Sequence, residues 1–337
     1  MSDNRTPNPT YDVLIAGQGA AGYAAAMYAA RYQIDPIILG ATFGGETATG
    51  GLIENYPGYV GIDGFDLMMN FKAQAENYDV PIIDENVASI TNNGHCFQAT
   101  TTDGNQFQAS TVILAVGRER RKLGLPNEEE WTGRGVSFCS TCDAPLHRDN
   151  IVATVGGGDA AVKGALLLSK YARQVYIIYR GEKFWRPEAV NLKALEASPN
   201  VTFVMQTNVI GLKGDSGLES IVLDKEVAGS NELVVDGIFV EIGADPLSEL
   251  AKRLGVALND QDEVIVDKFM RTNVHGVFAA GDLTDASGDL KQTITAAAQG
   301  SIAATSAYAD ITEHPNACDI SATGSGLEQE RIKATQA

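Results

Sequence analysis

The segment YDVLIAGQGAAG, residues 11–22, decides the fold. Its apolar, β-branched residues 11–16 predict a buried strand, and the glycines of GQGAAG follow directly. An alanine-rich helix is expected over residues 23–32 and a second strand over 36–39. A strand, a glycine-rich turn, a helix and a strand in this order are typical of the βαβ unit that binds dinucleotides.

The glycines of this turn each have a physical purpose. Gly17 permits a tight turn, Gly19 lets a pyrophosphate approach the backbone, and Gly22 lets the helix pack closely on the strand. The N-terminus of that helix then stabilises the phosphate charge. A glycine-rich turn without a ligand is the alternative. The acidic residue that usually ends the second strand is missing, since Leu39-Gly40 stands there, so a ribose contact must come from elsewhere.

The same pattern returns in the middle of the chain. Residues 151–155 predict a strand, and GGGDAA follows at 156–161. A helix expected over 162–171 leads to a strand over 174–179. Two such units in one chain predict two nucleotide-binding domains.

Further strand signals surround these two units. Residues 111–117 and 276–282 each predict a strand that ends in a glycine turn, and the second precedes a helix expected over 292–309. An antiparallel hairpin is expected from residues 95–101 and 106–110 around an Asp-Gly turn. The sequence therefore predicts an α/β fold with two Rossmann-like, three-layer domains and a small antiparallel sheet in each.

The domain boundaries follow from these units. The first domain is expected to be discontinuous and to comprise residues 1–118 and 247–312, with the second domain inserted at 119–246. Residues 313–337 turn polar and rich in glycine and serine, which indicates a C-terminal tail.

Composition disfavours several classes of function. A chain of 337 residues is long enough for two domains with ordinary cores. The net charge of −18 disfavours binding to nucleic acid or to an anionic membrane, so neither is expected as a partner. No apolar stretch is long enough to span a bilayer, and the polar N-terminus lacks the apolar core of a signal peptide. A cytoplasmic location is therefore expected.

The pair Cys139-Ser-Thr-Cys142 is the strongest chemical signal. Two nearby thiols can form a redox disulfide, half of a zinc site, or a pair of ordinary buried thiols. Zinc would need a second cysteine pair or suitably spaced histidines, which the sequence lacks. A redox dithiol is therefore favoured, with Asp143 beside it to move a proton. Cys96 and Cys318 are isolated in the sequence and are expected to be spectators, although Cys318 could serve as a third thiol in a relay.

Several motifs together resemble the low-molecular-weight thioredoxin reductases, from residue 10 to about residue 312. They are GQGAAG (17–22), GGETATGGLIENYPG (44–58), the turn at Gly117, CSTCD (139–143), GGGDAAVKGA (156–165) and GVFAAGD (276–282). The resemblance implies an FAD-dependent disulfide oxidoreductase that acts on thioredoxin or a similar dithiol protein, as a homodimer. It also implies that the inserted domain rotates about a hinge near residues 118–124 and 244–247.

The resemblance also assigns roles to single residues. Cys142 would lie next to the flavin, Cys139 would attack the substrate disulfide, and Asp143 would act as acid and base. Asn55 would lie beside the isoalloxazine, and Asp282 would hold the ribityl chain. The residues expected to bind FAD are Gly17, Gly19, Ala20, Ala21, Gly44, Gly45, Glu46, Asn55, Val87, Gly117, Gly281, Asp282, Lys291, Gln292 and Thr293.

The second nucleotide site departs from the family pattern. Members that use NADPH carry HRRxxxR after the second strand of the inserted unit to bind the 2′-phosphate, whereas Tyr179-Arg180-Gly181 begins this segment here. Each lost charged hydrogen bond weakens phosphate binding roughly tenfold to a hundredfold. The residues expected at this site are Gly156, Gly158, Asp159, Ala160, Tyr179, Arg180 and Arg186.

This departure favours the pyridine-nucleotide-independent branch of the family. Its electron donor would be ferredoxin, a deazaflavin or a second flavin, and the inserted domain would hold a second FAD or weakly bound NAD(P)H. Lys291, where these reductases usually carry arginine, points the same way if it alters the flavin environment. The simpler explanation of Lys291 is a conservative exchange.

Other functions stay open. An ordinary NADPH-dependent thioredoxin reductase with a degenerate phosphate site is one, and a dithiol oxidase that uses oxygen is another. A non-catalytic flavin redox sensor is a third, whereas ferredoxin–NADP⁺ reductases of similar fold lack the cysteine pair. The cationic run at 118–122 is either a solvated strip or a docking patch for an acidic partner. His314 could cap the flavin, although nothing else in the sequence supports that role.

Overall fold

The computed structural model describes residues 10–49, 52–94, 96–227, 229–288, 290–315 and 318. The fold divides into two compact units. Unit 1 comprises Met1–Ala48, Leu52–Arg118 and Pro246–Ala337, and unit 2 comprises Thr49–Gly51 and Glu119–Asp245. Most of the expected tail lies outside the described residues, as does His95, the first residue of the expected hairpin.

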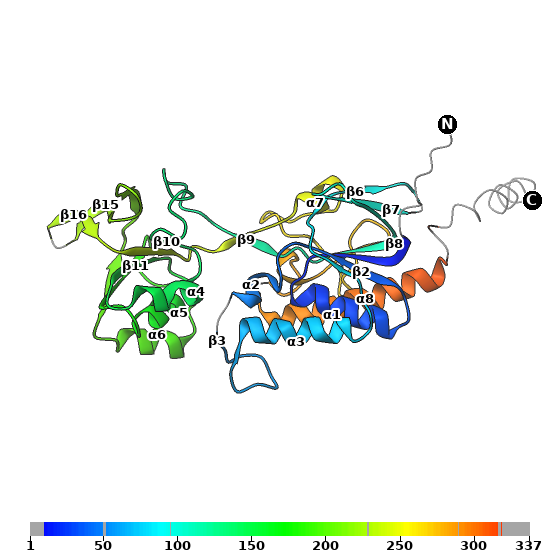
Figure 1. Cartoon of the computed structure of the whole chain (residues 1–337), viewed down its shortest axis with the longest axis horizontal. Helices are drawn as coiled ribbons and strands as arrows, with labels where there is room; N and C mark the ends of the chain where they lie inside the picture. Colours follow the sequence, from blue (N-terminus) through cyan, green and yellow to red (C-terminus); the bar gives the residue numbers. More distant parts are fainter. Residues whose placement is uncertain are drawn as a thin grey trace, which may run out of the picture. The chain divides into compact units, whose positions relative to one another are not determined.

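Unit 1 is built on a seven-stranded sheet with a parallel centre (Figure 1). The strand order is β5-β2-β1-β8-β7-β6, and β19 also pairs with β8. β1 pairs in parallel with β2 and β8, which brings the turns after these strands to one edge of the sheet. The strands are β1 (Thr10–Ala16), β2 (Pro36–Leu39), β5 (Ile82–Ile83), β6 (Val87–Asn92), β7 (Phe97–Thr101), β8 (Gln106–Leu114) and β19 (Val277–Ala279).

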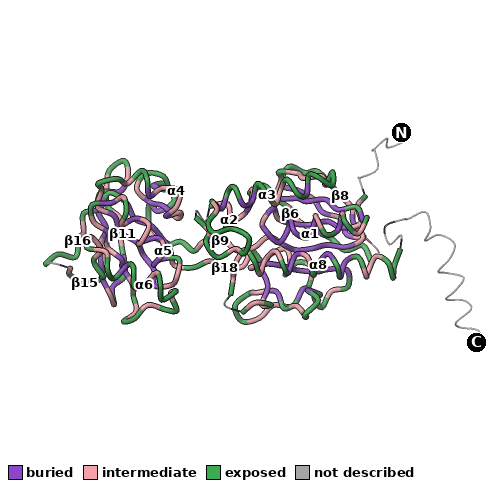
Figure 2. Tube along the Cα trace, turned by 90° about the horizontal axis from the view of Figure 1, so that it is seen from below, coloured by how far each residue is buried: buried purple, intermediate pink, exposed green. Residues whose placement is uncertain are grey.

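Helices α1 (Ala20–Arg31), α3 (Gly64–Glu76) and α8 (Thr293–Glu313) cover one face of this sheet (Figure 1). Successive residues of β1 point to opposite faces, so Ile15 packs in the core under the helices and Leu14 in the core on the other face. The buried strands and helix faces lie at the centre of the unit in Figure 2. The remaining elements are α2 (Gly45–Ala48), β3 (Leu52–Ile53), β4 (Ile62–Asp63), α7 (Glu249–Arg253) and the 3₁₀ turn Gly281–Leu283.

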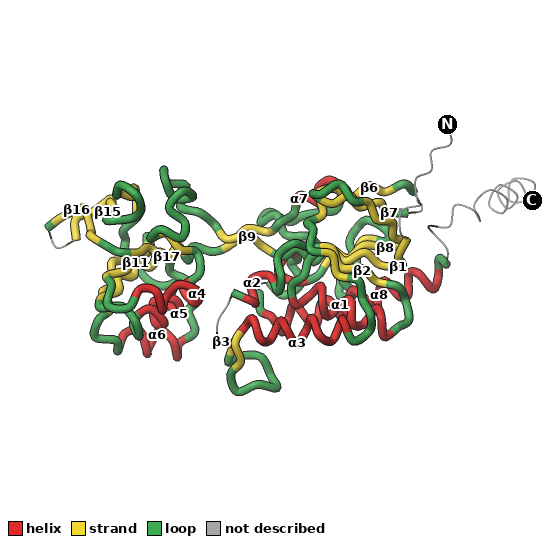
Figure 3. The backbone as a smooth tube through the Cα atoms, in the orientation of Figure 1, coloured by secondary structure: helices red, strands yellow, loops and turns green. Residues whose placement is uncertain are grey.

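Unit 2 has a five-stranded parallel sheet of order β10-β17-β11-β12-β13. Helices pack on one face, and the antiparallel sheet β14-β15-β16 packs on the other (Figure 3). The elements are β10 (Val136–Ser137), α4 (Ser140–Asp143), the 3₁₀ turn Ala144–His147, β11 (Ile151–Val155), α5 (Asp159–Leu168), β12 (Gln174–Tyr179), α6 (Ala189–Glu196), β13 (Val201–Met205), β14 (Val209–Lys213), β15 (Ser220–Val227), β16 (Ser230–Val234) and β17 (Gly237–Val240).

Two short strands lie where the chain passes between the units. These are β9 (Arg118–Arg120) and β18 (Ala244–Pro246), and they pair with each other. In the described part of the chain, no helix combines the length and apolarity needed to cross a membrane.

The predicted α/β class with Rossmann-like domains is confirmed, but several bounds differ. α1 and α5 begin at Ala20 and Asp159, earlier than expected, because Gly19 and Gly158 have extended backbone and stand at the N-cap positions. α8 runs on to Glu313. The strands expected at 106–110 and 111–117 form the single strand β8, so the antiparallel strands β6 and β7 extend the main sheet through β8.

The expectation that Cys96 and Cys318 are unrelated spectators is wrong. The two residues form a disulfide, with Cα atoms 4.9 Å apart although the residues are separated by 222 positions in the sequence. The bond joins the residue before β7 to a residue just beyond α8. Spacing in the sequence gives no signal for such a bond, because only the tertiary fold brings the two segments together.

Candidate functional site

The first glycine-rich turn has the geometry that phosphate binding needs. Gly17 has a φ of 119°, and a Cβ there would lie 2.2 Å from the Ala115 carbonyl oxygen. A Cβ on Gly22 would lie 2.0 Å from the Gly17 carbonyl oxygen, whereas one on Gly19 would meet no atom within 4 Å. The turn is therefore closed against the protein at Gly17 and Gly22 and open at Gly19, where the N–H groups of the first turn of α1 lack helical partners.

Gln18 connects this turn to an acidic residue that the sequence reasoning missed. Its buried side chain donates to Oδ1 of Asp84 at 2.7 Å, and the Tyr23 hydroxyl donates to Oε1 of Gln18 at 2.7 Å. Burial, with a smaller contribution from Asp84, raises the pKa of Tyr23. Asp84 follows β5, which pairs with β2 at Leu39 and Ile83. An acidic side chain from the neighbouring strand thus lies beside the first turn, although none follows β2 itself.

The segment at Gly44, Gly45 and Glu46 lies against the first turn. Gly44 and Gly45 have φ values of 66° and 54°, and a Cβ on Gly45 would lie 3.6 Å from Cα of Gly19. Glu46 is in the first turn of α2. The side chain of the following residue, Thr47, lies 3.0 Å from that of Thr293, oxygen to oxygen.

The N-terminus of α8 meets the same region. Asn55 donates from Nδ2 to Oε1 of Gln292 at 2.9 Å, which joins two residues expected beside the flavin. The 3₁₀ turn that begins at Gly281 also lies close to α1, since a Cβ on Gly281 would be 3.1 Å from the Cβ of Ala21. The structure thus brings together four segments that were predicted to bind FAD, near residues 17–21, 44–46, 281–282 and 291–293.

Asp282 lies in a network of charges. Burial raises the pKa of its carboxyl group, while Lys291 and Arg118 oppose that shift and Glu46 adds to it. Lys291 and Arg118 each contact Oε1 of Glu263 at 2.9 Å, and Lys291 also donates to the Thr284 carbonyl. Lys291 is therefore held by unit 1 itself, which agrees with its interpretation as a conservative exchange.

The remaining expected FAD ligands lie near these turns or on the strands that lead to them. Ala20 and Ala21 form the first turn of α1, and a Cβ on Gly300 of α8 would lie 2.0 Å from the Ala21 carbonyl oxygen. Gly117 has a φ of 72° and open space at its Cβ position. Val87 begins β6 and pairs with Thr101 of β7.

These residues fit FAD on structural grounds. Gly19 is open at a helix N-terminus, where the pyrophosphate of a dinucleotide binds. The carboxyl group of Asp282 is desolvated, as a hydrogen-bonding group facing a cofactor would be. Among the described residues, Nε of Arg118 is buried without a hydrogen-bond partner, so an acceptor is missing beside this network. Unit 1 would hold the cofactor through these groups.

In unit 2, Cys139 and Cys142 form a disulfide, with Cα atoms 5.3 Å apart. Cys139 is the N-cap of α4, and the backbone N–H of Cys142 donates to Sγ of Cys139 at 3.1 Å. After reduction, the same N–H would stabilise a thiolate on Cys139 and favour it as the nucleophile. Sγ of Cys139 lies 3.2 Å from the Thr49 carbonyl oxygen, and Cys142 is exposed.

A carboxylate that the sequence reasoning missed anchors this disulfide. Glu241 follows β17 and accepts a hydrogen bond at 2.8 Å from the Ser140 hydroxyl. The Glu241 carbonyl oxygen would lie 2.1 Å from a Cβ on Gly156. A Cβ on Gly164 of α5 would lie 2.5 Å from Oγ of Ser140. Ser140 thus packs between α5 and the residue after β17. Because Glu241 also lies against Gly156, the second glycine-rich turn helps to position the dithiol.

Asp143 ends α4 and acts electrostatically on His147, the last residue of the 3₁₀ turn that follows. Burial lowers the pKa of His147, while Asp143 and Asp236 oppose the shift. The imidazole packs edge-on against Phe239, with ring centroids 5.2 Å apart. Asp143 therefore has a titratable neighbour in His147.

The second glycine-rich turn lies beneath an aromatic side chain. Gly156 has a φ of 146°, and a Cβ on Gly157 would lie 2.2 Å from the Tyr179 ring. Tyr179 stacks on Phe184, with centroids 6.0 Å apart and planes 13° apart. The backbone N–H of Trp185 donates to the Gly157 carbonyl at 2.7 Å. Of the three glycines of this turn, only Gly158 has open space at its Cβ position.

Two of the charged residues expected at this second site, Asp159 and Arg186, already contact other residues of unit 2. Asp159 accepts from the Glu188 backbone at 3.0 Å and pairs with Lys163 at 2.9 Å. Arg186 lies over the Trp185 ring at 5.4 Å. Arg180 is exposed, and Ala160 lies in the first turn of α5. The two arginines that could meet a 2′-phosphate are therefore both exposed on the surface.

Ion pairs partly neutralise the cationic run at 118–122. They are Arg118–Glu263, Arg121–Asp245 and Lys122–Glu129. A docking patch for an acidic partner would need free positive charge, so these pairs favour the solvated strip.

Comparison with known proteins identifies relatives along nearly the whole chain. Residues 11–300 match the pyridine nucleotide-disulphide oxidoreductases. A thioredoxin reductase from Mycolicibacterium smegmatis is 40% identical over 299 residues, which cover 88% of this chain and 94% of that protein. A bifunctional thioredoxin reductase/thioredoxin from Mycobacterium leprae is 37% identical over 317 residues, or 92% of this chain and 69% of that protein. The crystal structure of Lactococcus lactis thioredoxin reductase in its FR conformation has 35% identity and a TM-score of 0.83, covering 90% of this chain and 99% of that one.

These relatives give no specific support to a pyridine-nucleotide-independent branch. A thioredoxin reductase with an ordinary NADPH donor fits them at least as well as the donor that the sequence favoured.

Proposed function

Because the chain belongs to the low-molecular-weight thioredoxin reductase family, we propose that it passes electrons from a pyridine nucleotide, through FAD and Cys139–Cys142, to thioredoxin. Family membership makes it a flavin-dependent disulfide oxidoreductase, and FAD is its cofactor. The disulfide between Cys139 and Cys142 carries the proposal, because unit 2 holds both residues in place for exchange. Homodimer formation and a cytoplasmic location stay predictions.

The chemistry of the dithiol is thiol–disulfide exchange. Reduced FAD, when bound, would supply the two electrons and one proton that convert the Cys139–Cys142 disulfide to one thiolate and one thiol. The Cys139 thiolate, stabilised by the N–H of Cys142, attacks one sulfur of the thioredoxin disulfide and expels the other as a thiolate. The Cys142 thiolate then attacks Cys139 in the mixed disulfide, which restores the intramolecular bond and releases reduced thioredoxin. We assign Asp143 to take the proton from the Cys142 thiol before this attack and to pass it to a thiolate of thioredoxin.

The donor would bind at the second turn of unit 2. Gly158 is open at the N-terminus of α5, where a pyrophosphate can approach. Arg180 and Arg186 would meet a 2′-phosphate, which favours NADPH over NADH. The name of the matching family supports a pyridine nucleotide as the donor.

The decisive experiment adds NADPH and then NADH to the oxidised flavoprotein without oxygen and follows the visible absorbance of the flavin. Rapid loss of absorbance at micromolar NADPH, followed by reduction of thioredoxin, is the expected result. The double variant Arg180→Ala/Arg186→Ala should weaken NADPH binding at least about tenfold and leave NADH binding nearly unchanged. A Cys139→Ser variant should still lose its flavin absorbance with NADPH, but it should not reduce thioredoxin.

One observation favours a second candidate, in which the donor is not a pyridine nucleotide. The Tyr179 ring covers Gly157, where a nucleotide would approach the middle of the turn. In that case neither NADPH nor NADH reduces the flavin, whereas reduced ferredoxin or a reduced deazaflavin does. Tyr179→Ala separates the two candidates further, because uncovering Gly157 should strengthen NADPH binding only if the nucleotide binds at this turn.

A further inference from the structure

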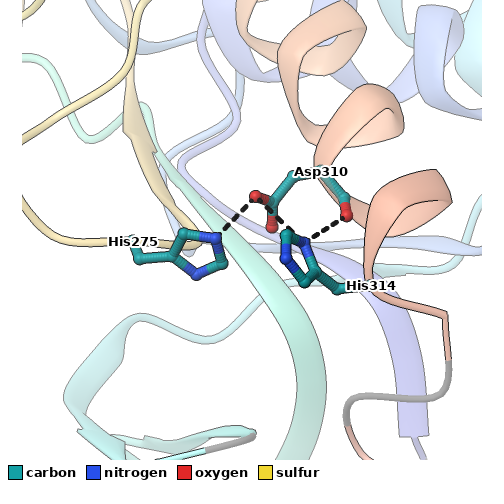
Figure 4. A group of neighbouring side chains, drawn as sticks. All are labelled: His275, Asp310 and His314. Carbon is teal, nitrogen blue, oxygen red and sulfur yellow. Dashed lines mark hydrogen bonds and ion pairs between the residues drawn. The ribbon is translucent and has the colours of Figure 1, made fainter.

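A group of three metal-binding side chains lies in unit 1 at the C-terminal end of α8, the end opposite the proposed flavin contacts (Figure 4). Its members are His275, from the loop before β19, and Asp310 and His314, one helical turn apart on and just beyond α8. α8 has 21 residues, so its two ends lie about 30 Å apart. His314 is therefore far from Gln292 and Thr293, and the idea that it caps the flavin is not supported.

The three side chains converge on one carboxylate. Nε2 of His275 lies 3.0 Å from Oδ1 of Asp310, and Nδ1 of His314 lies 3.8 Å from the same oxygen. One candidate ligand atom from each residue lies within 4.8 Å of the others. Figure 4 shows both imidazole rings turned toward Asp310. Within the described residues, histidines are the only ion-pair partners of this carboxylate.

These distances suit a zinc ion. Zinc takes imidazole nitrogen and carboxylate oxygen ligands at about 2.0–2.2 Å in tetrahedral geometry, which places the ligand atoms about 3.4 Å from one another. The two histidine–Asp310 separations, 3.0 and 3.8 Å, lie on either side of that value, and the two imidazoles offer nitrogens within 4.8 Å of each other. The Asp310 side chain is 19% exposed, whereas His275 and His314 are 72% and 55% exposed. Water can therefore reach the fourth position, and the exposed imidazoles can rotate.

One rearrangement is needed. Nδ1 of His314 lies 3.1 Å from the Asp310 backbone carbonyl, so this nitrogen has an alternative partner when no metal is present. A ring rotation at an exposed side chain would exchange that contact for a bond to zinc. The alternative interpretation is a plain ion pair, in which protonated histidines balance Asp310 and the C-terminal end of the helix dipole.

The Cys96–Cys318 disulfide would restrict this rearrangement to a small space. Cys318 lies four positions beyond His314 and is bonded to Cys96. The residue after Cys96, Phe97, lies 2.9 Å from the position of a Cβ on Gly276, which is the neighbour of His275. The disulfide therefore ties the chain beyond His314 to the strand on which the His275 segment packs. Such preorganisation strengthens metal binding, because less freedom is lost when the ligands come together.

We propose that His275, Asp310 and His314 form a zinc site whose affinity depends on the Cys96–Cys318 disulfide. The site is separate from the proposed redox centre, and nothing in the thioredoxin reductase reaction requires it. The class of ligand is a late divalent transition metal, since imidazole suits zinc and its neighbours and not magnesium or calcium.

The test is a calorimetric titration of untagged, FAD-loaded, oxidised protein with Zn²⁺, so that Cys139 and Cys142 are not available as competing ligands. One zinc ion per chain is expected, with no comparable heat from Mg²⁺. Asp310→Asn and His275→Ala should each weaken zinc binding at least about tenfold. Glu313→Gln, which removes the same charge from an exposed neighbour, should leave zinc binding unchanged. Absence of binding, or equal affinity in all four proteins, would overturn the site.

The disulfide is tested separately with the double variant Cys96→Ser/Cys318→Ser, which leaves no free thiol to bind zinc. We expect weaker zinc binding in this variant, with thioredoxin reduction at the wild-type rate. Unchanged zinc affinity would overturn the dependence on the disulfide. The thermal unfolding midpoint gives a second readout, because zinc that binds only the folded state should raise it in the wild type and in Glu313→Gln but not in Asp310→Asn. A rise in all three would mean that zinc binds elsewhere.

Discussion

The two glycine-rich turns begin with the same constraint and end in different surroundings. At the first glycine, Gly17 and Gly156 both have positive φ, and a Cβ on either would lie 2.2 or 2.1 Å from a backbone carbonyl oxygen. At the middle position, Gln18 is tied into a buried hydrogen-bond network, whereas Gly157 lies beneath Tyr179. The glycine pattern thus fixes the shape of the turn, while the middle residue and the end of the second strand decide what can lie above it.

The largest expected loss of stability comes from two separate variants, Gly17→Ala and Gly156→Ala. Each new Cβ would collide with a carbonyl oxygen and force a backbone conformation that alanine avoids, so each should cost more than about 2 kcal/mol of unfolding free energy. Gly17→Ala should purify without FAD. Gly156→Ala should keep FAD in unit 1 but reduce thioredoxin slowly, because the displaced Glu241 no longer holds Ser140.

Flavin content by absorbance, thioredoxin turnover and chemical denaturation together check this pair. Loss of FAD from both variants, or from neither, would break the assignment of FAD to the first turn.

The second pair, Gly19→Ala and Gly158→Ala, separates ligand contact from folding. Neither Cβ would meet a protein atom within 4 Å, so the unfolding free energy of the apoprotein should change by less than about 0.5 kcal/mol in each. Gly19→Ala should weaken FAD binding at least about tenfold, since the methyl group stands where the pyrophosphate approaches. Gly158→Ala should leave FAD binding intact and weaken NADPH binding instead.

Fluorescence titration of the apoprotein with FAD and of the holoprotein with NADPH measures both affinities. Full FAD affinity in Gly19→Ala would show that this turn does not face the cofactor.

A smaller change in stability, which depends on pH, is expected from Asp282→Asn. Burial raises the pKa of Asp282, so the folded apoprotein holds this proton more tightly than the unfolded chain. The contribution of Asp282 to stability is therefore complete below the unfolded pKa of about 3.9 and is lost as the pH rises through the folded value. The asparagine variant avoids this loss, so its apoprotein should be more stable than the wild type at pH 7, and the advantage should vanish in acid.

The same variant should bind FAD more weakly, because the proposed contact to the ribityl chain is altered. Denaturant unfolding of the apoprotein between pH 4 and 7, alongside FAD titration, checks both outcomes. A stability advantage that persists unchanged in acid would rule out the titration of Asp282 as its cause. Glu46→Gln serves as the control for the pH dependence of stability only, since Glu46 is a minor contributor to the raised pKa of Asp282.

Local sequence patterns predicted the α/β class and the enzyme family because those signals are short-range. The strand, turn and helix of residues 11–22 need only alternating burial and glycines at fixed positions. Asp84 and Glu241 could not be found in this way, since each reaches its partner across neighbouring strands of a sheet. Nor could the Cys96–Cys318 bond, which depends on where α8 ends. The electron donor could not be predicted, because the degenerate phosphate-binding motif after β12 shows which contacts are lost but not what replaces them.

The smallest effect concerns the core beside the dithiol in unit 2. Burial lowers the pKa of His147, so the unfolded chain binds this proton more readily than the folded one. Stability is therefore complete above the unfolded pKa of about 6.5 and falls as the pH drops toward the folded value. His147→Gln should remove that slope between pH 7 and 5 and leave FAD content unchanged, as measured by urea unfolding at each pH. An identical slope in His147→Gln would assign the pH dependence of stability to other groups. Asp236→Asn removes a negative charge that raises the pKa of His147 and so opposes the effect of burial. If His147 causes the slope, this second variant should make it steeper.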